Sequence, residues 1–415
     1  SSLRRAWGRP LAVVVLAVAT IVCREMPSVD RSRYPPMLPD DYESFKPPAV
    51  GGSYVDSTFG TTIRRLTEGG VFHDYATMTA VNADDSLVLA ESSRGYWVID
   101  LTGRVVVPVE VLDIGPWESA KWSRKDPGLI YFYRGNALMA ADTRTREHRV
   151  VHQFTQFKVV SDGGGATDVS EDGDHLLIDA DDRYIGVYEI STDRLGPLLD
   201  TQGFDREEDA VDLSPENRVV INWHSSSRHP IKIVEVFDHD MRLQQRLNTT
   251  GGHWDLGRDV DGEEILLTFG WADSSDPPGC EGGGLIKTRL RDGVEICVSG
   301  GWNGQHVSAV GPLPWVVVSS MDHEHQTADP TLPPDWRQRW RPFENEVVLV
   351  KTDGSVVRRL AHHRSRRYQD YYYYPFATMS ASGRTVIFNS NMGVQPFKDY
   401  TDIYAIQLTA ADFAD

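Results

Sequence analysis

The sequence predicts an all-β protein folded as a seven-bladed β-propeller. Three observations indicate this fold: a short phrase recurs seven times, a hairpin-like pair of strands lies between successive copies, and a segment near residue 60 resembles an outer strand that the last unit lacks. The chain has 415 residues. This exceeds an ordinary domain of roughly 100–200 residues, and a repeat architecture explains the length without a second fold.

The repeated phrase is a short segment, then Ser, Asn or Asp, then a turn with Asp or Gly, and then a strand rich in Val, Ile and Leu. The copies centre on Asn82, Ser123, Ser170, Ser214, Asp259, Ala309 and Ser380, and all spacings but the last are 41–50 residues. The last spacing, 71 residues, contains a polar, Pro-rich insertion at about 322–343. Units of about 40–50 residues are typical of propeller blades.

Between the phrases lie second strand pairs, such as residues 96–109 and 346–360, each with an Asp/Gly-type turn in its middle. Such a pattern indicates a β-hairpin. Together with the phrase it supplies four strands per unit, which is the content of a propeller blade. A pair of packed sheets would not explain seven copies in phase.

The two ends of the repeat region predict how the ring closes. After the seventh phrase only one more strand is apparent, at residues 402–408, whereas residues 60–68, "GTTIRRLTE", resemble the outer strand "GSVVRRLAH" at 354–362. We expect the N-terminal strand to complete the last blade, which would leave no exposed sheet edge.

Residues 1–50 differ from the repeat region. Residues 1–23 are predicted to be a signal peptide or an N-terminal anchor, because Arg4 and Arg5 precede an apolar run of twelve residues from Leu11 to Val22. That run is shorter than the roughly 20 residues that cross a bilayer, and a buried N-terminal helix is the alternative. Residues 24–50 are a Pro-rich lead-in, and residues 51–415 form the propeller. We therefore expect a secreted or periplasmic protein with no stable membrane insertion after processing.

Three cysteines occur, and Cys23 lies in the export segment. Cys280 and Cys297 flank one predicted hairpin. An oxidising compartment would permit a disulfide between them, and two free buried thiols are the alternative.

The charge balance argues against a nucleic-acid partner. Asp and Glu number 60 against 42 Lys and Arg, a formal net charge of −18, whereas proteins that bind phosphates present basic surfaces. The 11 Trp and 16 Tyr supply both core and flat faces on which sugars stack. We expect a monomer.

The phase of the repeat locates a site. In a four-stranded blade the segment entering the inner strand and the loop after the second strand lie on one face, near the channel. The entering segments carry His73, Asp74, Tyr75, Trp117, Glu118, Glu207, Glu208, Asp209, His253, Trp254, Asp255, Gln305, His306 and Tyr371–Tyr374. The loops add Arg94, Arg134, His224, Arg228, Trp271, His323, His325, Asn389 and Asn391.

A single histidine at such a position is often structural, but here histidines from several blades converge. Arg would neutralise a carboxylate, His or Tyr would move protons, and aromatic faces would stack on sugar rings. The pattern favours an anionic, hydroxyl-rich ligand in a central funnel.

Four segments carry a resemblance to a known family: residues 73–89, "HDYATMTAVNADDSLVL"; 251–267, "GGHWDLGRDVDGEEILL"; 304–320, "GQHVSAVGPLPWVVVSS"; and 358–393, from "RRLAHH" to "NSNMG". From about Gly60 onward the chain resembles the propeller-fold polysaccharide lyases, the oligogalacturonate lyase and ulvan lyase group. Part of this likeness is the repeat pattern common to β-propellers, which TolB-like proteins share.

The resemblance implies β-elimination at a uronic acid within an anionic polysaccharide or oligosaccharide. Under this hypothesis His253 and His306 transfer protons, Tyr373 or Tyr374 donates one, and His73 supports them. Arg94 and Arg228 are the candidates for binding the carboxylate. Arg134, Trp254, His224 and Asn391 complete the predicted substrate-binding set.

One departure from the family concerns the metal. The resemblance implies a metal-binding Gln and His pair just before the last inner strand, where this chain has Tyr371, Tyr374 and Phe376. We therefore predict no cofactor and no metal in the reaction. A structural Ca²⁺, or a divalent ion bound by His306, His323 and His325, is the alternative.

Two other functions fit the same pattern. A propeller hydrolase would use paired carboxylates, which Glu208, Asp209 and Asp255 would supply. A non-catalytic module that binds a glycan or a protein needs only the polar funnel.

Overall fold

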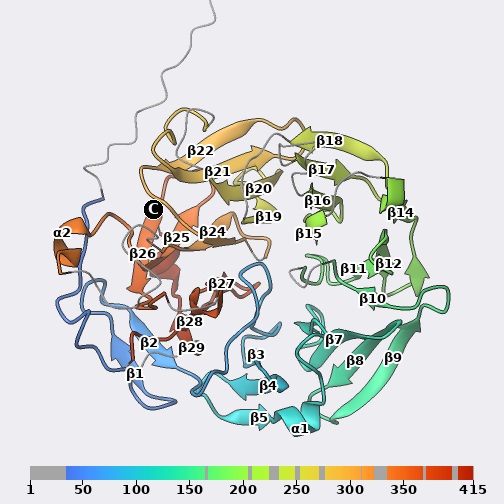
Figure 1. The fold of residues 1–415 in the computed structure, drawn as a ribbon, viewed down its shortest axis with the longest axis horizontal. Helices are drawn as coiled ribbons and strands as arrows, with labels where there is room; N and C mark the ends of the chain where they lie inside the picture. Colours follow the sequence, from blue (N-terminus) through green and yellow to red (C-terminus); the bar gives the residue numbers. More distant parts are fainter. Residues whose placement is uncertain are drawn as a thin grey trace, which may run out of the picture.

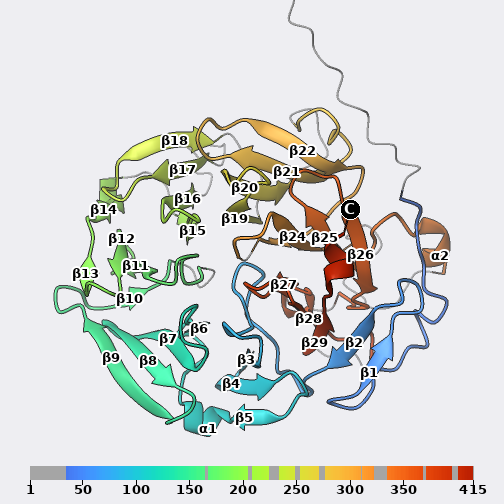
Figure 2. The ribbon, with the colours of Figure 1, turned by 180° about the vertical axis from the view of Figure 1, so that it is seen from behind.

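The computed structural model describes residues 34–163, 167–203, 208–223, 233–247, 253–270, 276–309, 311–321, 334–367, 371–394 and 401–414. They form seven antiparallel sheets that follow one another around a central axis (Figure 1). The reverse view shows the same ring of blades (Figure 2). The predicted seven-bladed β-propeller is therefore confirmed. Within the described ranges, no helix has the length and apolar character that a membrane-spanning segment requires.

The blades follow the chain in order. Blade 1 contains β3 (Leu87–Ser92), β4 (Gly95–Asp100) and β5 (Val105–Val107), followed by the short helix α1 (Val109–Leu112). Blade 2 contains β6 (Lys121–Trp122), β7 (Leu129–Arg134), β8 (Ala137–Asp142) and β9 (Glu147–Gln153). Blade 3 contains β10 (Val160–Ser161), β11 (His175–Ala180), β12 (Tyr184–Glu189), β13 (Arg194–Leu195) and β14 (Leu199–Asp200). Blade 4 contains β15 (Glu208–Leu213), β16 (Val219–Trp223), β17 (Ile233–Phe237) and β18 (Leu243–Leu247).

The remaining blades complete the ring. Blade 5 contains β19 (Trp254–Arg258), β20 (Glu264–Phe269), β21 (Gly284–Arg289) and β22 (Glu295–Gly300). Blade 6 contains β23 (His306–Ser308), β24 (Trp315–Ser319), β25 (Glu346–Lys351) and β26 (Val357–His362), with helix α2 (Trp336–Arg339) between β24 and β25. Blade 7 contains β27 (Thr378–Met379), β28 (Thr385–Ser390), β29 (Asp402–Gln407), β2 (Thr62–Arg65) and β1 (Ser53–Val55).

Blade 7 combines strands from both ends of the described chain. β2 pairs antiparallel with β29, with Ile63 opposite Ile406 and Arg65 opposite Tyr404. In Figure 1 the blue strands β1 and β2 lie beside the red strands β28 and β29. Ile63 is fully buried in this blade, so the pairing also contributes apolar contacts.

The repeated phrase has a common hydrogen-bonding role. Its Ser or Asn side chain accepts the amide of the residue that begins the second strand, which closes the turn between the first two strands. The oxygens of Asn82, Ser170, Ser214 and Ser380 accept the amides of Leu87, His175, Arg218 and Thr385 at 2.9, 2.9, 3.1 and 3.1 Å.

The burial of the strands explains their Val-, Ile- and Leu-rich sequences. β16 and β24 are buried along their whole length, because a neighbouring blade covers each face of the sheet. β18, an outer strand, is largely exposed. Apolar runs therefore mark the middle strands, and mixed sequences mark the outer ones.

Two features add covalent and apolar contacts to those between the strands. Cys280 and Cys297 form a disulfide, which decides between the two alternatives that the sequence left open. In the lead-in, Tyr42 is buried and its ring packs against Trp336 and Trp340, with centroids 5.4 and 4.9 Å away.

Candidate functional site

Two histidines and a tyrosine meet at one mouth of the channel. His253 immediately precedes β19, His306 begins β23, and Tyr371 opens a 3₁₀ turn, Tyr371–Tyr373, ahead of β27. The inner strands β19, β23 and β27 contact one another in turn, which brings these residues together. The two imidazole rings stack with centroids 4.2 Å apart and planes inclined by 14°. Tyr371 Oη lies 2.9 Å from His306 Nε2 and 3.3 Å from His253 Nε2.

The partners of these three side chains assign the direction of each hydrogen bond. His253 Nδ1 lies 2.9 Å from the carbonyl oxygen of Gln305. A carbonyl only accepts, so Nδ1 of the neutral ring carries the proton, and Nε2 accepts the hydroxyl proton of Tyr371. A phenol has a single proton, so His306 Nε2–H donates to Tyr371 Oη. The hydrogen bonds therefore run from His306 through Tyr371 and His253 to Gln305.

Aromatic rings surround this chain of hydrogen bonds. Tyr75, Tyr374 and Phe376 meet the His306 ring edge-on, with centroids 5.3, 5.0 and 4.6 Å away. Tyr75 Oη also lies 3.5 Å from Tyr371 Oη. His306 is buried, whereas Tyr371 is 42% exposed. Tyr371 is consequently the member of the group that a ligand in the funnel would contact.

The structure changes which tyrosine belongs to the site. Tyr373 and Tyr374 were the predicted proton donors, but both are buried and stack on each other with centroids 4.3 Å apart. Burial, and then the Tyr373 hydroxyl, raise the pKa of Tyr374, which opposes its ionisation. The 3₁₀ turn directs Tyr371, rather than these two, toward the histidine pair.

His73 lies near the histidine pair but is enclosed. Its ring is buried, and burial lowers the pKa of His73 to about 3 against the opposing effect of the Pro375 and Phe376 backbone. Asn389 fixes the segment, since its side chain exchanges hydrogen bonds of 3.0 and 2.9 Å with the His73 backbone. His73 is thus a neutral residue of the funnel wall. This is compatible with its predicted supporting role and not with proton transfer.

The two described arginines of the predicted set are engaged in ion pairs. Arg94 pairs with Glu110. Arg134 binds Glu118 through Nε at 2.5 Å and Nη2 at 2.8 Å, and also lies over the Phe132 ring. No contact of the described chain brings either arginine to the histidine pair.

Two further predicted ligand-binding residues have structural contacts instead. Trp254 is 6% exposed and packs in an apolar cluster with Val220 and Leu266, so its ring offers no face for a sugar, contrary to the prediction. Asn391 accepts the Arg366 amide at 2.8 Å and donates to the Arg366 carbonyl at 2.6 Å, which closes a loop. His224, Arg228, Trp271, His323 and His325 lie outside the described residues.

A group of acids that the sequence did not single out as a set lies on the blade 1 side of the same mouth. Glu91 and Tyr96 are directly opposite on β3 and β4, and Tyr96 Oη donates to Asp74 Oδ2 at 3.1 Å. Burial, and then the charge of Asp162, raise the pKa of Asp74 to about 6. Burial and Asp74 raise the pKa of Glu91 to about 9. The sequence feature that could have revealed this group is a glutamate inside the apolar strand "LVLAES" at 87–92.

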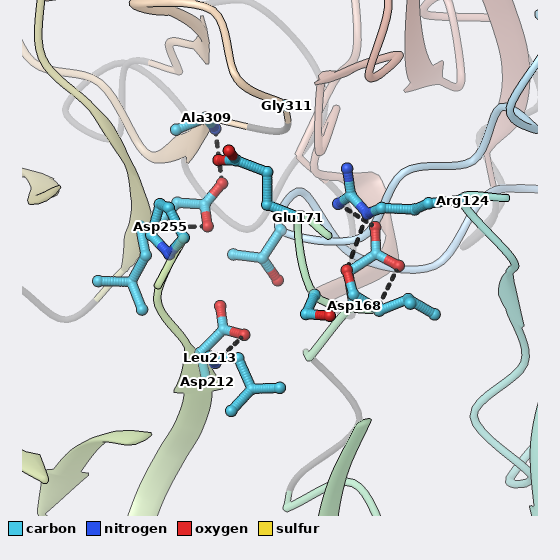
Figure 3. A pocket seen from close by; sticks show the side chains of 13 residues that line it. Arg124, Asp168, Glu171, Asp212, Leu213, Asp255, Ala309 and Gly311 are labelled. Carbon is cyan, nitrogen blue, oxygen red and sulfur yellow. Dashed lines mark hydrogen bonds and ion pairs between the residues drawn. The ribbon is translucent and has the colours of Figure 1, made fainter. Parts of the chain in front are cut away.

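A second group of acids lines a small cavity of about 40 Å³ farther along the channel (Figure 3). Figure 3 shows Asp168, Asp212 and Asp255 around this cavity, with Arg124 beside Asp168. Each aspartate accepts the amide of the next residue at 2.7 Å. Burial is the main cause that raises the pKa of Asp255 to about 7 and that of Asp212 well above its ordinary value.

This cavity lies farther along the inner strands than the histidine pair, and its lining residue Asp255 is two residues after His253. Glu171, Pro215 and Gly311, which also line it, belong to turns at the far ends of the inner strands. Asp168 and Asp212 each lie two residues before the serine of the repeated phrase, Ser170 and Ser214. This shared position in the repeat would have identified them from the sequence. Asp255 is one of the three predicted hydrolase carboxylates, and Ala309 donates its amide to it at 2.6 Å.

The histidine pair does not fit a shared metal ion. The point that both Nε2 atoms approach is occupied by Tyr371 Oη, at 2.9 and 3.3 Å, whereas two histidine ligands must converge at about 2.0–2.1 Å on one ion. Among the residues that the structure places, no group of three His, Cys, Asp or Glu side chains is arranged to bind an ion. The alternative cluster of His306 with His323 and His325 lies partly outside the described residues.

Comparisons with known proteins come from structure alone. No protein-family model matches the sequence, and no curated protein matches it. An oligogalacturonate lyase in complex with manganese superposes with a TM-score of 0.60 at 12% identity, over 88% of this chain and 97% of that one. An oligogalacturonate lyase from Vibrio parahaemolyticus gives 0.56 at 12% identity, over 87% and 97%.

The RRP9 WD40 repeats give a TM-score of 0.50 at 12% identity, over 86% of this chain and all of that one. At such low identity these comparisons show the fold alone and do not establish an activity. What this chain has in common with these proteins is the β-propeller fold.

Proposed function

We propose that this protein is a polysaccharide lyase that cleaves a uronic-acid-containing oligosaccharide by β-elimination at the mouth of the channel. The observation that carries the proposal is the partly exposed Tyr371 hydroxyl, which is hydrogen-bonded to both His253 and His306. The fold shared with two oligogalacturonate lyases supports this proposal, and so does the resemblance of the sequence to the same group.

The reaction requires one proton to move from carbon to oxygen. The carbon next to the uronate carboxyl loses its proton to Tyr371 Oη, while the hydroxyl proton of Tyr371 passes to His253 Nε2. The electron pair left on carbon forms the new double bond, and the bond to the glycosidic oxygen breaks. That oxygen takes the proton from Tyr371, and His253 returns its proton to Tyr371. No further reactant is needed.

The roles of the three residues differ. Tyr371 is the catalytic residue, because it is the most exposed of the three and its hydroxyl contacts both histidines. His253 and His306 are positioning residues that act through it: His253 accepts its proton, and His306 Nε2–H stabilises the negative charge that develops on Oη. The parallel imidazole rings hold both contacts in place at once.

We also propose that the protein works outside the cytoplasm. The Cys280–Cys297 disulfide supports this, because such bonds persist in oxidising compartments. Labelling of free thiols in protein recovered from the native host would test it, since a reduced pair would contradict export.

The reaction is tested by incubating the protein with tetragalacturonate and with a panel of other uronate polysaccharides, and recording the ultraviolet absorbance of the unsaturated product. Tyr371→Phe should lower kcat by roughly 10²–10⁴-fold, the usual contribution of a general acid–base group. Tyr373→Phe is the matched control and should retain activity, because Tyr373 is buried beside Tyr374. Equal rates for the two variants would contradict the role of Tyr371.

A second candidate is a non-catalytic glycan-binding module. The fold shared with the RRP9 WD40 repeats favours this candidate, because a β-propeller need not be an enzyme. Saturable binding of an oligosaccharide without any product would support this candidate. New reducing ends without the absorbance would instead indicate a hydrolase.

A further inference from the structure

Glu91 is a nearly enclosed carboxyl group without a hydrogen-bond partner in the described structure. It is 9% exposed, and its position on β3 is held by backbone hydrogen bonds of 2.9 and 2.6 Å with Phe72. Directly opposite residues of an antiparallel pair project to the same face of the sheet, so Glu91 shares its face with Tyr96. The Tyr96 hydroxyl donates to Asp74, so the three side chains form one group.

Among the described residues, the cation that acts on this group is Lys121, and it is already paired. Lys121 on β6 binds Asp162 at 2.5 Å and lies 5.3 Å from the centre of the Tyr133 ring. The titratable and charged groups that act on Asp74 and Glu91 are therefore Tyr96 of β4, Asp162 following β10, and Lys121 of β6. Burial and these neighbours raise the pKa of both carboxyls, so Glu91 is a neutral acid at neutral pH.

A neutral carboxylic acid at this place has an O–H to donate, and the influences on Glu91 from the described residues are burial and the charge of Asp74, with no hydrogen bond among them. A ligand oxygen would supply the acceptor. The strongest acceptor among sugar groups is a carboxylate, since hydrogen bonds to ionised oxygen are roughly twice as strong as neutral ones.

The group adjoins the site at Tyr371 through neighbouring residues of one segment. Tyr75, whose hydroxyl lies 3.5 Å from that of Tyr371, packs on His306, and the next residue back along the chain, Asp74, accepts the hydrogen bond of Tyr96 from blade 1.

We propose that Glu91 and Asp74 form a subsite in which their carboxylic acids donate hydrogen bonds to the carboxylate of an acidic sugar unit. This inference rests on the proposed function for its ligand class. It assigns the neutralisation of the uronate to a pair of acids rather than to Arg94 or Arg134, which are occupied by Glu110 and Glu118.

Binding at this subsite takes up a proton. Asp74, whose pKa is about 6 in the free protein, must be protonated to donate to an anion, and the bound carboxylate favours that form. Affinity for an anionic sugar is then highest at acidic pH and falls as pH rises past the pKa of Asp74. A cationic sugar would show the opposite dependence, because it would bind the ionised pair.

The experiment measures the affinity of tetragalacturonate by calorimetry in the Tyr371→Phe background, which prevents turnover, from about pH 8 to about pH 5. The galactose tetrasaccharide, its carboxyl-reduced form, is the neutral control. We expect at least a tenfold gain in affinity for tetragalacturonate across this range and none for the control. Adding Asp74→Asn should abolish the pH dependence.

A second set of variants tests the donor. Glu91→Ala should lower the affinity for tetragalacturonate by at least tenfold and leave the affinity for the control ligand unchanged. Unchanged binding of the control also shows that the fold is intact. Glu91→Gln retains an N–H donor and should restore the affinity. Equal weakening of both ligands by Glu91→Ala would overturn the proposal, as would tighter binding at higher pH. Arg367, whose charge acts on Tyr374, is the competing candidate for binding the uronate carboxylate. If Arg367→Gln removes the preference for the anionic ligand and Glu91→Ala does not, the proposal would also be overturned.

The two proposals fail separately. Acid-dependent, Glu91-dependent binding of tetragalacturonate without an unsaturated product would refute the elimination and support the subsite. Elimination by the wild-type protein together with pH-independent binding in the Tyr371→Phe background would refute the subsite and support the reaction.

Discussion

Replacing Glu91 with glutamine is expected to stabilise the folded protein at neutral pH. The glutamate must hold a proton there that the unfolded chain does not bind, because burial and the charge of Asp74 raise its pKa from 4.5 to about 9. Each pH unit above 4.5 costs the folded state about 1.4 kcal/mol, which amounts to about 3 kcal/mol at pH 7. Glutamine has the shape of the neutral acid without this cost.

The sign of the pH dependence follows from the direction of the shift. A group whose pKa is raised by folding contributes its full stability below the unfolded pKa, and that contribution is lost as pH rises through the folded pKa. The free energy of unfolding of Glu91→Gln should therefore equal that of the wild type near pH 4.5 and exceed it by about 3 kcal/mol at pH 7.

Urea unfolding of both proteins at these two pH values, followed by Trp fluorescence, measures the difference. Glu110→Gln is the matched control: Glu110 is exposed and paired with Arg94, and its own backbone amide and Arg94 lower its pKa, so no gain at neutral pH is expected. The reasoning about the buried acid would be refuted by a Glu91→Gln effect that is the same at both pH values.

Three further predictions concern stability. Reduction of the Cys280–Cys297 disulfide, which closes a segment of 17 residues, should lower the free energy of unfolding by about 3 kcal/mol in the chain-entropy account, and unchanged urea midpoints with and without reductant would contradict this. Trp254→Ala should cost about 3–5 kcal/mol as a core truncation, whereas Trp117→Ala, at a side chain that is 88% exposed, should stay within about 0.5 kcal/mol; similar melting temperatures for the two variants would show that Trp254 is not part of the core. Lys121→Ala leaves Asp162 buried without its cation and should cost about 3–5 kcal/mol, a loss that the double variant with Asp162→Asn should partly recover in the same unfolding assay.

The fold was predictable because its signals are local and repeated. A Ser or Asn that closes a turn, followed by an apolar strand, recurs in five of the seven units, Asp259 and Ala309 take its place in the other two, and the period of the phrase predicts seven blades. The phase also predicted that His253 and His306 would lie at one mouth of the channel, since both occupy the segment entering an inner strand.

The choice among neighbouring tyrosines was not predictable in the same way. Tyr371–Tyr374 form one run in the sequence, and the 3₁₀ turn at Tyr371–Tyr373 decides which hydroxyl reaches the histidine nitrogens. The predicted Tyr373 and Tyr374 are buried, and Trp254 packs in the core, because the rotation of each side chain about its backbone depends on the neighbouring blade.

The sequence by itself determined the number of blades, the order of the strands and the face on which the polar residues gather, because hydrogen-bonded turns and apolar strands are encoded over a few residues. Tertiary structure alone decided the directions of the hydrogen bonds around Tyr371, the pairing of Arg94 and Arg134 with glutamates, and the protonation of Asp74 and Glu91. These depend on distances between blades and on exclusion of water, and residues far apart in the chain acquire both only when the ring has closed.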